Sequence, residues 1–233
     1  MFAAFEDLSG KPAIRSKEAP YVFITFEGTE GSGKSTQIAR TNAWLTRCGQ
    51  AAVTTREPGG CALGLSLRAI LLDARNTHLD ATAELFLYLA DRAQHVAEVI
   101  RPALAHGVVV LCDRYHDSTV AYQGFGRGLL DTDRLSVLGE IAAGGLVPDI
   151  TVLLDLPVEQ GLARARSRND ATGKDLAEGR FEALDLTFHQ RVRDGFLTLA
   201  AREPDRFAVI DATGGPDEVF TRVRSALADR LSL

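Results

Sequence analysis

Five short runs rich in Val, Ile and Leu recur along the chain, separated by longer stretches in which apolar residues have helical spacing. Several of the short runs are apolar at consecutive positions, which is typical of strands buried on both faces of a parallel sheet. The predicted strands are Tyr21–Glu27, Ala51–Thr55, Gly107–Asp113, Asp149–Asp155 and Arg206–Ala212.

The stretches between and after these strands have the apolar period of amphipathic helices. The predicted helices are Lys34–Cys48, Ala83–Ala105, Asp131–Ala143, Val158–Ser167, Phe181–Ala201 and Asp217–Leu231. Alternating strands and helices predict right-handed crossovers and an open α/β sheet with helices on both faces.

Two segments depart from this pattern. Residues 1–20 mix charges with prolines and lack the apolar centre of a signal peptide, so we predict a flexible tail before a single domain over 21–233. Residues 166–180 are polar and contain glycine. We predict an exposed loop there, either a lid over an active site or a plain surface loop.

The composition argues against nucleic acid and membranes as binding partners. A formal net charge of -5 gives no global basic field for nucleic acid or an anionic membrane surface, so phosphate binding must rest on local arginines and backbone amides. The three scattered cysteines fit neither a disulfide framework nor metal-ligand spacing, which indicates a reducing cytoplasm. No apolar stretch is long enough to span a membrane.

The stretch GTEGSGKST has the G-x-x-x-x-G-K-S spacing of a phosphate-binding loop, and it lies between a predicted strand and a predicted helix. Backbone amides of such a loop and the following helix N-terminus bind nucleotide phosphates. Lys34 is expected to reach the β- and γ-phosphates, and Ser35 to ligate Mg²⁺. The predicted ATP-binding residues are Gly28, Thr29, Glu30, Gly31, Ser32, Gly33, Lys34, Ser35 and Thr36.

Several proteins that bind nucleotides carry such a loop, and the position of the arginines in this chain indicates a small-molecule kinase. The guanine-reading N-K-x-D motif of common GTPases is absent from the sequence. A small-molecule kinase needs a second anion site, rich in arginine, that faces the γ-phosphate. Arg56 and Arg114 directly follow predicted strands, where open α/β sheets bind ligands. Asp113 ends a strand and is a candidate Mg²⁺ ligand, with Asp155 as the competing candidate.

Aromatic and amide side chains lie near these arginines. Tyr88 precedes Arg92 by one helical turn, and Tyr122 and Gln123 follow Arg114 at a short distance along the chain. An aromatic ring can stack on a base, and a Gln amide can pair with a pyrimidine edge. A core role for Tyr88 remains an alternative. The residues by themselves predict a nucleotide-dependent kinase whose acceptor already carries a phosphate.

Five motifs in order resemble the bacterial thymidylate kinase (dTMP kinase) family: FEGTEGSGKST, TREPGG, LYLADRAQH, DRYHDSTVAYQGFGRG and VPDITVLLDLP. The resemblance covers essentially Tyr21 to Leu233. It implies the P-loop nucleoside-monophosphate kinase fold, with a five-stranded parallel sheet, flanking helices and an arginine-bearing lid. It also implies the reaction ATP + dTMP → ADP + dTDP, with Mg²⁺ and a homodimer.

The resemblance also implies roles for single residues around the acceptor. Glu30 is expected to contact the sugar 3′-hydroxyl, and Tyr122 to crowd the 2′ position and disfavour ribonucleotides. Arg56 and Arg114 are expected to bind the dTMP phosphate, with Arg68 nearby. Tyr88 stands where relatives usually carry a phenylalanine that stacks on thymine. The residues expected to hydrogen-bond the base are Arg92, Thr119 and Gln123.

The family pattern implies that the transition-state charge comes from the lid. Some relatives carry an arginine after the loop glutamate, whereas this chain has Gly31. Arg180 matches the lid arginine, although the aspartate that usually precedes it is missing. The predicted catalytic residues are Glu30, Lys34, Asp113, Arg114 and Arg180, with Ser35 and Asp113 for the metal.

Two alternatives remain at this stage. A kinase of the same fold could use another nucleoside or nucleotide as acceptor. A non-catalytic nucleotide-binding switch would bind a triphosphate without transferring its phosphoryl group, and it would need neither a base pocket nor a lid arginine.

Overall fold

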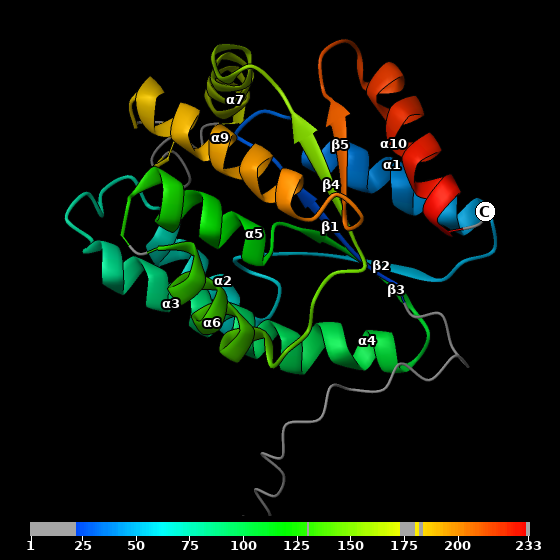
Figure 1. Ribbon diagram of the computed structural model, residues 1–233, viewed down its shortest axis with the longest axis horizontal. Coiled ribbons are helices and arrows are strands. Elements are labelled where there is room, and N and C mark those ends of the chain that lie inside the picture. Colours follow the sequence, from blue (N-terminus) through cyan, green and yellow to red (C-terminus); the bar gives the residue numbers. More distant parts are fainter. Residues whose placement is uncertain (1–21, 130, 173–179, 182–183, 232–233) are drawn as a thin grey trace, which may run out of the picture.

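Five parallel strands form one sheet at the centre of the protein (Figure 1). The structure, a computed structural model, describes residues 22–129, 131–172, 180–181 and 184–231. The strand order is β2-β3-β1-β4-β5, with bounds β1 Phe23–Glu27, β2 Ala52–Arg56, β3 Val109–Asp113, β4 Ile150–Asp155 and β5 Phe207–Asp211. All five predicted strands are confirmed.

Helices cover both faces of the sheet, as the alternating pattern predicted. Their bounds are α1 Lys34–Arg47, α2 Ala62–Leu72, α3 Ala81–His95, η1 Val96–Ile100, α4 Arg101–Ala105, α5 His116–Thr119, η2 Val120–Gly126, α6 Thr132–Ala143, α7 Val158–Thr172, α9 Leu186–Arg202 and α10 Pro216–Leu231. The elements α3, η1 and α4 follow one another without a break and correspond to one predicted helix.

The structure corrects three predictions. Helix α2 was not predicted, because its sequence ALGLSLRAILL is apolar on most sides and so lacks a clear helical period. Residues 168–172, predicted as loop, continue α7, because once the helix has formed each further residue adds a backbone hydrogen bond, which outweighs the weak propensity of the polar residues. Helix α9 begins at Leu186 and not at Phe181, because Asp185 caps its N-terminus by accepting from the Phe188 amide. The remainder of the proposed lid, 173–179, and the tail lie outside the described residues.

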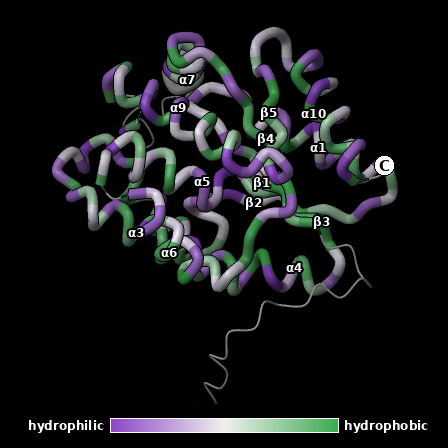
Figure 2. The backbone as a smooth tube through the Cα atoms, in the orientation of Figure 1, coloured by the Kyte–Doolittle hydropathy of each residue, from purple (hydrophilic) through white to green (hydrophobic). Residues whose placement is uncertain are grey.

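Each face of the sheet has its own apolar core. Helices α1 and α10 lie side by side on one face, where Ile38 and Val223 pack against Ile24 and Phe26 of β1 (Figure 1). On the other face α3, η2, α6 and α9 enclose a second core. Figure 2 shows hydrophobic and hydrophilic residues alternating along the helices, as expected where one side meets the sheet. Among the described residues, no helix combines the length and apolarity needed to cross a membrane.

The pairing of β1 with β3 determines where the functional segments leave the sheet. Phe26 lies opposite Asp113 in the parallel register, and the Arg114 amide donates to the Phe26 carbonyl at 3.0 Å. The loop that follows β1 therefore emerges beside the residues that follow β3. Open α/β sheets bind their ligands at this edge.

Val152 offers a test of the packing. Its side chain is fully buried in the centre of the sheet, so Val152→Ala removes two buried carbon atoms, worth about 0.8 kcal/mol each, and leaves a cavity. We expect the free energy of unfolding to fall by about 2 kcal/mol in denaturant titrations. The matched change Val209→Ala, on the edge strand at 50% exposure, should cost less than about 1 kcal/mol. Equal losses at the two sites would contradict this core assignment.

Candidate active site

A cavity of about 360 Å³ lies at the carboxyl edge of the sheet and gathers most of the predicted site residues. It opens between the phosphate loop, the ends of β2 and β3, and the helices α3, α5 and η2. The predicted residues that line it are Glu30, Gly31, Gly33, Lys34, Ser35, Thr36, Arg56, Arg68, Tyr88, Arg92, Asp113, Arg114, Thr119, Tyr122 and Gln123. Gly28, Thr29 and Ser32 belong to the loop but lie behind this lining.

The phosphate loop is packed tightly against α7. Gly31 has a left-handed φ of 69°, and a Cβ atom there would lie 2.0 Å from the carbonyl oxygen of Gly161. No residue other than glycine fits this contact without movement of the helix. The Lys34 ammonium donates to the carbonyl oxygens of Gly28 at 3.0 Å and Thr29 at 2.9 Å. Burial, together with the nearby Arg114 charge, lowers the pKa of Lys34 to about 8.

Ser35 and Asp113 form the pair of groups best suited to a divalent cation. The Ser35 hydroxyl donates to the Asp113 carboxylate at 3.1 Å, at the mouth of the loop. Mg²⁺ prefers oxygen ligands and is bound in nucleotide sites by one or two protein groups plus phosphate oxygens, so this donor set fits the ion. Asp155, the competing candidate, instead accepts both hydrogen bonds of a bidentate pair with Arg193 at 2.7 and 2.9 Å.

Arg114 on the acceptor side of the cavity is held by three side-chain hydrogen bonds. Its backbone has a positive φ of 70°, an uncommon conformation for a residue with a side chain. Its guanidinium donates to Ser118 at 3.0 Å, to Tyr122 at 2.9 Å and to the Glu30 carboxylate at 3.2 Å. These contacts hold the guanidinium in the cavity, facing the phosphate loop.

Two further arginines line the same wall. Arg56, the last residue of β2, is exposed, and Arg68 of α2 donates to the Pro58 carbonyl oxygen at 3.0 Å. The cavity therefore has guanidinium groups opposite the phosphate loop. This is the arrangement that a phosphorylated acceptor requires.

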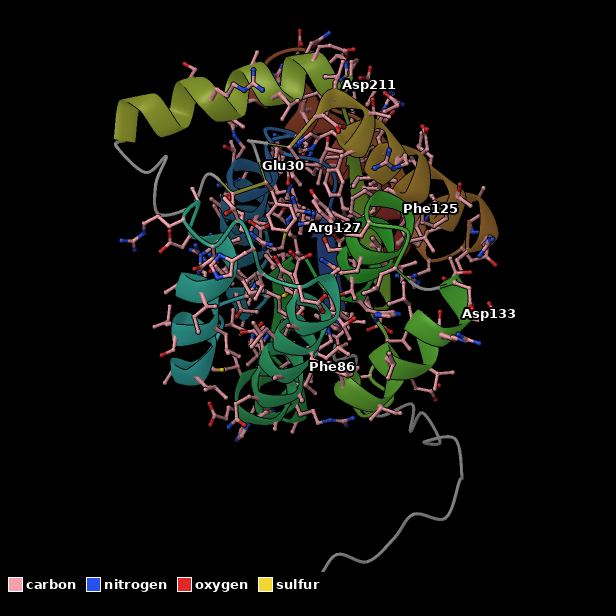
Figure 3. All side chains as sticks on the ribbon, turned by 90° about the vertical axis from the view of Figure 1, so that its left-hand side faces the viewer. Glu30, Phe86, Phe125, Arg127, Asp133 and Asp211 are labelled. Carbon is pink, nitrogen blue, oxygen red and sulfur yellow. The ribbon has the colours of Figure 1, made fainter. Side chains whose placement is uncertain are left out.

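Glu30 is the central acid of the site. Its carboxylate accepts from Arg114 and from the Tyr122 hydroxyl, and its second oxygen lies 3.1 Å from Nδ1 of His189 in α9. Burial alone would raise its pKa, but the His189 hydrogen bond and the Arg114 charge outweigh burial and lower the pKa to about 2. Figure 3 looks onto this side of the molecule and labels Glu30. The carboxylate is therefore ionised at neutral pH.

The deeper end of the cavity has the groups of a base pocket. Tyr88 is half-buried and lines the cavity, and burial raises the pKa of its phenol, which stays neutral. Arg92 is almost fully buried; its Nε donates to Glu57 at 2.9 Å and one terminal nitrogen donates to Thr119 at 3.0 Å. Its other terminal nitrogen, Nη1, has no hydrogen-bond partner among the described residues. A buried donor of this kind is suited to an acceptor atom of a ligand.

Arg180 lies apart from the phosphate loop in this structure. Its guanidinium is 2.6 Å from the Glu84 carboxylate and donates to the carbonyl oxygens of Leu71 at 3.1 Å and Asn76 at 3.2 Å. The side chain is 8% exposed and is absent from the cavity lining. The other predicted catalytic residues thus lie together in the cavity, whereas the Arg180 side chain packs outside it, against α2 and α3.

Sequence reasoning did not single out several residues that hold this site together. Glu57 fixes Arg92, and Ser118 and His189 hold Arg114 and Glu30. Glu84 contacts three polar side chains at the base pocket. The spacing along the chain could have indicated Glu84, because it precedes Tyr88 by four residues and so lies on the same face of α3. His189 has none, because its contacts join segments distant in sequence.

Comparisons with known proteins agree on one family. The family model described as thymidylate kinase matches residues 26–223. Thymidylate kinase from Solidesulfovibrio magneticus is 66% identical over 87% of this chain and 96% of its own. Thymidylate kinase from Nitratidesulfovibrio vulgaris (strain Miyazaki F) is 59% identical over 91% of this chain and 98% of its own.

A solved structure agrees with the sequence matches. The crystal structure of thymidylate kinase from Ehrlichia chaffeensis is 32% identical, with a TM-score of 0.70 over 89% of this chain and 98% of that one. Its fold is that of a P-loop nucleoside-monophosphate kinase, as the five-stranded sheet and phosphate loop described above require. The chain belongs to the thymidylate kinase family.

Proposed function

We propose that the protein transfers the γ-phosphoryl group of ATP to dTMP, giving ADP and dTDP. The observation that carries this proposal is the cavity itself, in which a phosphate loop faces a group of arginines and a deeper pocket for a base. Membership of the thymidylate kinase family supports the choice of acceptor. The product would supply the synthesis of dTTP.

The acceptor phosphate would be bound by Arg114 and Arg56, with Arg68 beside them. Guanidinium groups offset the repulsion between two polyanions and hold the acceptor oxygen in line with the γ-phosphorus. That oxygen is already anionic, so the step needs no strong general base. Positioning and charge neutralisation therefore account for the catalysis that these side chains can supply.

The sugar would lie against Glu30 and Tyr122. The ionised Glu30 carboxylate can accept from the 3′-hydroxyl. The Tyr122 hydroxyl donates to the same carboxylate, so its ring lies beside that position and close to C2′. A ribose 2′-hydroxyl would then meet the ring of Tyr122.

The base would stack on Tyr88 and receive hydrogen bonds deeper in the cavity. The unpartnered Nη1 of Arg92 is a donor for a carbonyl oxygen of thymine. Thr119 and Gln123 line the cavity near it and complete the polar edge. The Tyr88 ring supplies a flat apolar surface.

At the phosphate loop, Lys34 would turn from its own loop carbonyls to the β- and γ-phosphates. Ser35 and Asp113 would hold Mg²⁺, which when bound neutralises phosphate charge in this class of reaction. We also propose Arg180 as the lid arginine of the transition state. In that role it must exchange Glu84 for the transferring phosphoryl group.

We further propose a cytoplasmic homodimer. The three cysteines, Cys48, Cys61 and Cys112, are free thiols, as in proteins of a reducing compartment. Exposed apolar side chains lie on three adjacent helices, α2, α3 and α6, and a second copy of the chain could cover them. These side chains are Leu63, Leu65, Ile70, Phe86, Val137 and Ile141.

The two alternatives are less well supported. A kinase for an unphosphorylated nucleoside would not need the arginine group opposite the loop. A nucleotide-binding switch would not need the buried Arg92 and Gln123 at the deep end of the cavity. Both features favour catalysis on a nucleoside monophosphate.

The acceptor can be identified directly. ADP release by the purified protein with ATP and Mg²⁺ should depend strongly on dTMP and much less on dUMP, dCMP, AMP or thymidine. A faster rate with another acceptor would retain the kinase and overturn the base-site assignment. A slow rate that ignores every acceptor would point to the switch.

Arg114→Ala should lower kcat/KM for dTMP by about 10³-fold, because the anionic acceptor loses a counter-charge that three hydrogen bonds hold in the cavity. ATP binding, measured by calorimetry, should remain. Arg222→Ala is the matched control, since Arg222 contacts Asp211 and Thr213 at the surface away from the cavity. Turnover of the Arg114 variant at the wild-type rate would remove this residue from the acceptor site.

Tyr122→Ala should relax the discrimination between dTMP and its ribo analogue by at least about tenfold, because the ring no longer fills the space beside C2′. The ratio of the two kcat/KM values is the measurement. Tyr122→Phe keeps the ring among Phe181, Phe188 and Phe196 and should retain most of the discrimination. An unchanged ratio in the alanine variant would show that another group excludes the ribonucleotide.

A further inference from the structure

Glu84 is a fully buried acid next to the base pocket, and it does not itself line the cavity. Two guanidinium groups contact its carboxylate, with Arg180 Nη1 at 2.6 Å and Arg127 Nη2 at 3.0 Å. Arg127, labelled in Figure 3, directly follows η2 and contacts Glu84 of α3 through its guanidinium group. Both contacts are ion pairs, and a carboxylate held in ion pairs offers only acceptor oxygens.

This acceptor determines how the amide of Gln123 is turned. The Gln123 side chain is 1% exposed, and its nitrogen Nε2 lies 2.9 Å from Glu84 Oε1. The carboxylate has no proton to give, so the NH₂ end of the amide must face Glu84. The carbonyl end of the amide then faces away from Glu84. Because Gln123 lines the cavity, this oxygen is the atom that the amide offers to a bound base.

Arg92, which also lines the cavity, offers a hydrogen-bond donor where Gln123 offers an acceptor. Its Nη1 is a donor without a partner in the described part of the chain, while Thr119 and Glu57 occupy its other nitrogens. The matching base edge has an acceptor oxygen, which receives a hydrogen bond from Arg92, next to an imino N–H, which donates to the Gln123 oxygen. Thymine and uracil present this order at O4 and N3, whereas cytosine presents the reverse, an amino donor and a bare ring nitrogen.

We propose that Glu84 is a positioning residue that sets base specificity by fixing the orientation of the Gln123 amide. This inference rests on the proposed function, since it concerns the base of the same acceptor. Glu84 does not line the cavity, and its effect on base choice passes through Gln123, whereas its ion pair with Arg180 bears equally on every acceptor. Without it, the amide could rotate and offer its NH₂ group, which suits the bare N3 of cytosine and opposes the N3–H of thymine.

Glu84→Gln tests this with little change of shape. The new amide should place its oxygen at the Oε2 position, where Arg180 Nη1 and Arg127 Nη2 both donate, and its NH₂ at the Oε1 position, where it meets Gln123 and gives up the longer 3.3 Å contact with Arg127 Nε. Gln123 must then present its oxygen to residue 84 and its nitrogen to the cavity. Glu84 also holds Arg180, and a change in that ion pair alters the rate with both acceptors alike, so the measurement is the dTMP/dCMP ratio of kcat/KM, which we expect to fall by about tenfold to a hundredfold. dTMP should remain the better substrate, because Arg92 still opposes the cytosine amino group.

Two comparisons separate this mechanism from a general loss of structure. Glu98→Gln, an equal change of charge at an exposed position, should leave the dTMP/dCMP ratio unchanged. In a Gln123→Met background, Glu84→Gln should have no further effect on the ratio, because the amide through which Glu84 acts is gone.

If Glu84→Gln fails to fold, Glu84→Asp keeps a negative charge beside Arg127 and Arg180 but shortens the side chain by one methylene group, which lengthens the contact with Gln123, and it should also lower the ratio. Equal losses with dTMP and dCMP, an unchanged ratio, or an effect that persists in Gln123→Met would each overturn the inference. A wild-type enzyme without preference for dTMP over dCMP would overturn the proposed function and this inference together. A wild-type preference that Glu84 variants leave intact would overturn the inference alone.

Discussion

The parallel pairing of β1 with β3 fixes the phosphate loop relative to the arginine that faces it. Both strands run in the same direction, with Phe26 opposite Asp113, so both chains leave the sheet at the same edge. An antiparallel pair would send them to opposite edges. The distance between Ser35 and Asp113, and that between Glu30 and Arg114, both follow from this register. The helices then only have to close the sides of the space.

A second requirement is electrostatic. A site for two polyanions needs several guanidinium groups, yet an unpaired buried charge costs several kcal/mol before any ligand arrives. The structure meets this requirement by pairing four buried or half-buried arginines at the cavity and beside it with acids: Arg92 with Glu57, Arg114 with Glu30, and Arg127 and Arg180 with Glu84. A phosphate that enters the cavity therefore competes with a carboxylate for an arginine that is already in place.

The sequence predicted the sheet well because buried parallel strands are continuous apolar runs. It placed Arg56 and Arg114 at the ligand-binding edge of the sheet, because both directly follow such runs. It also placed Tyr88 and Arg92 on one face of a helix by their spacing. It did not predict α2, whose apolar surface hides the helical period, or the extension of α7 through residues 168–172. The roles of Glu84 and His189 depend on contacts between distant segments, which no local pattern encodes.

The contact between Gly31 and Gly161 constrains how the protein can evolve. A side chain at either position would strike the backbone of the other segment, since a Cβ atom on Gly161 would lie 2.4 Å from the Glu30 carbonyl oxygen. An arginine at position 31 is thus inaccessible by one substitution unless α7 first shifts. As long as α7 packs this closely, a lineage that descends from this chain must recruit its transition-state cation from some other segment.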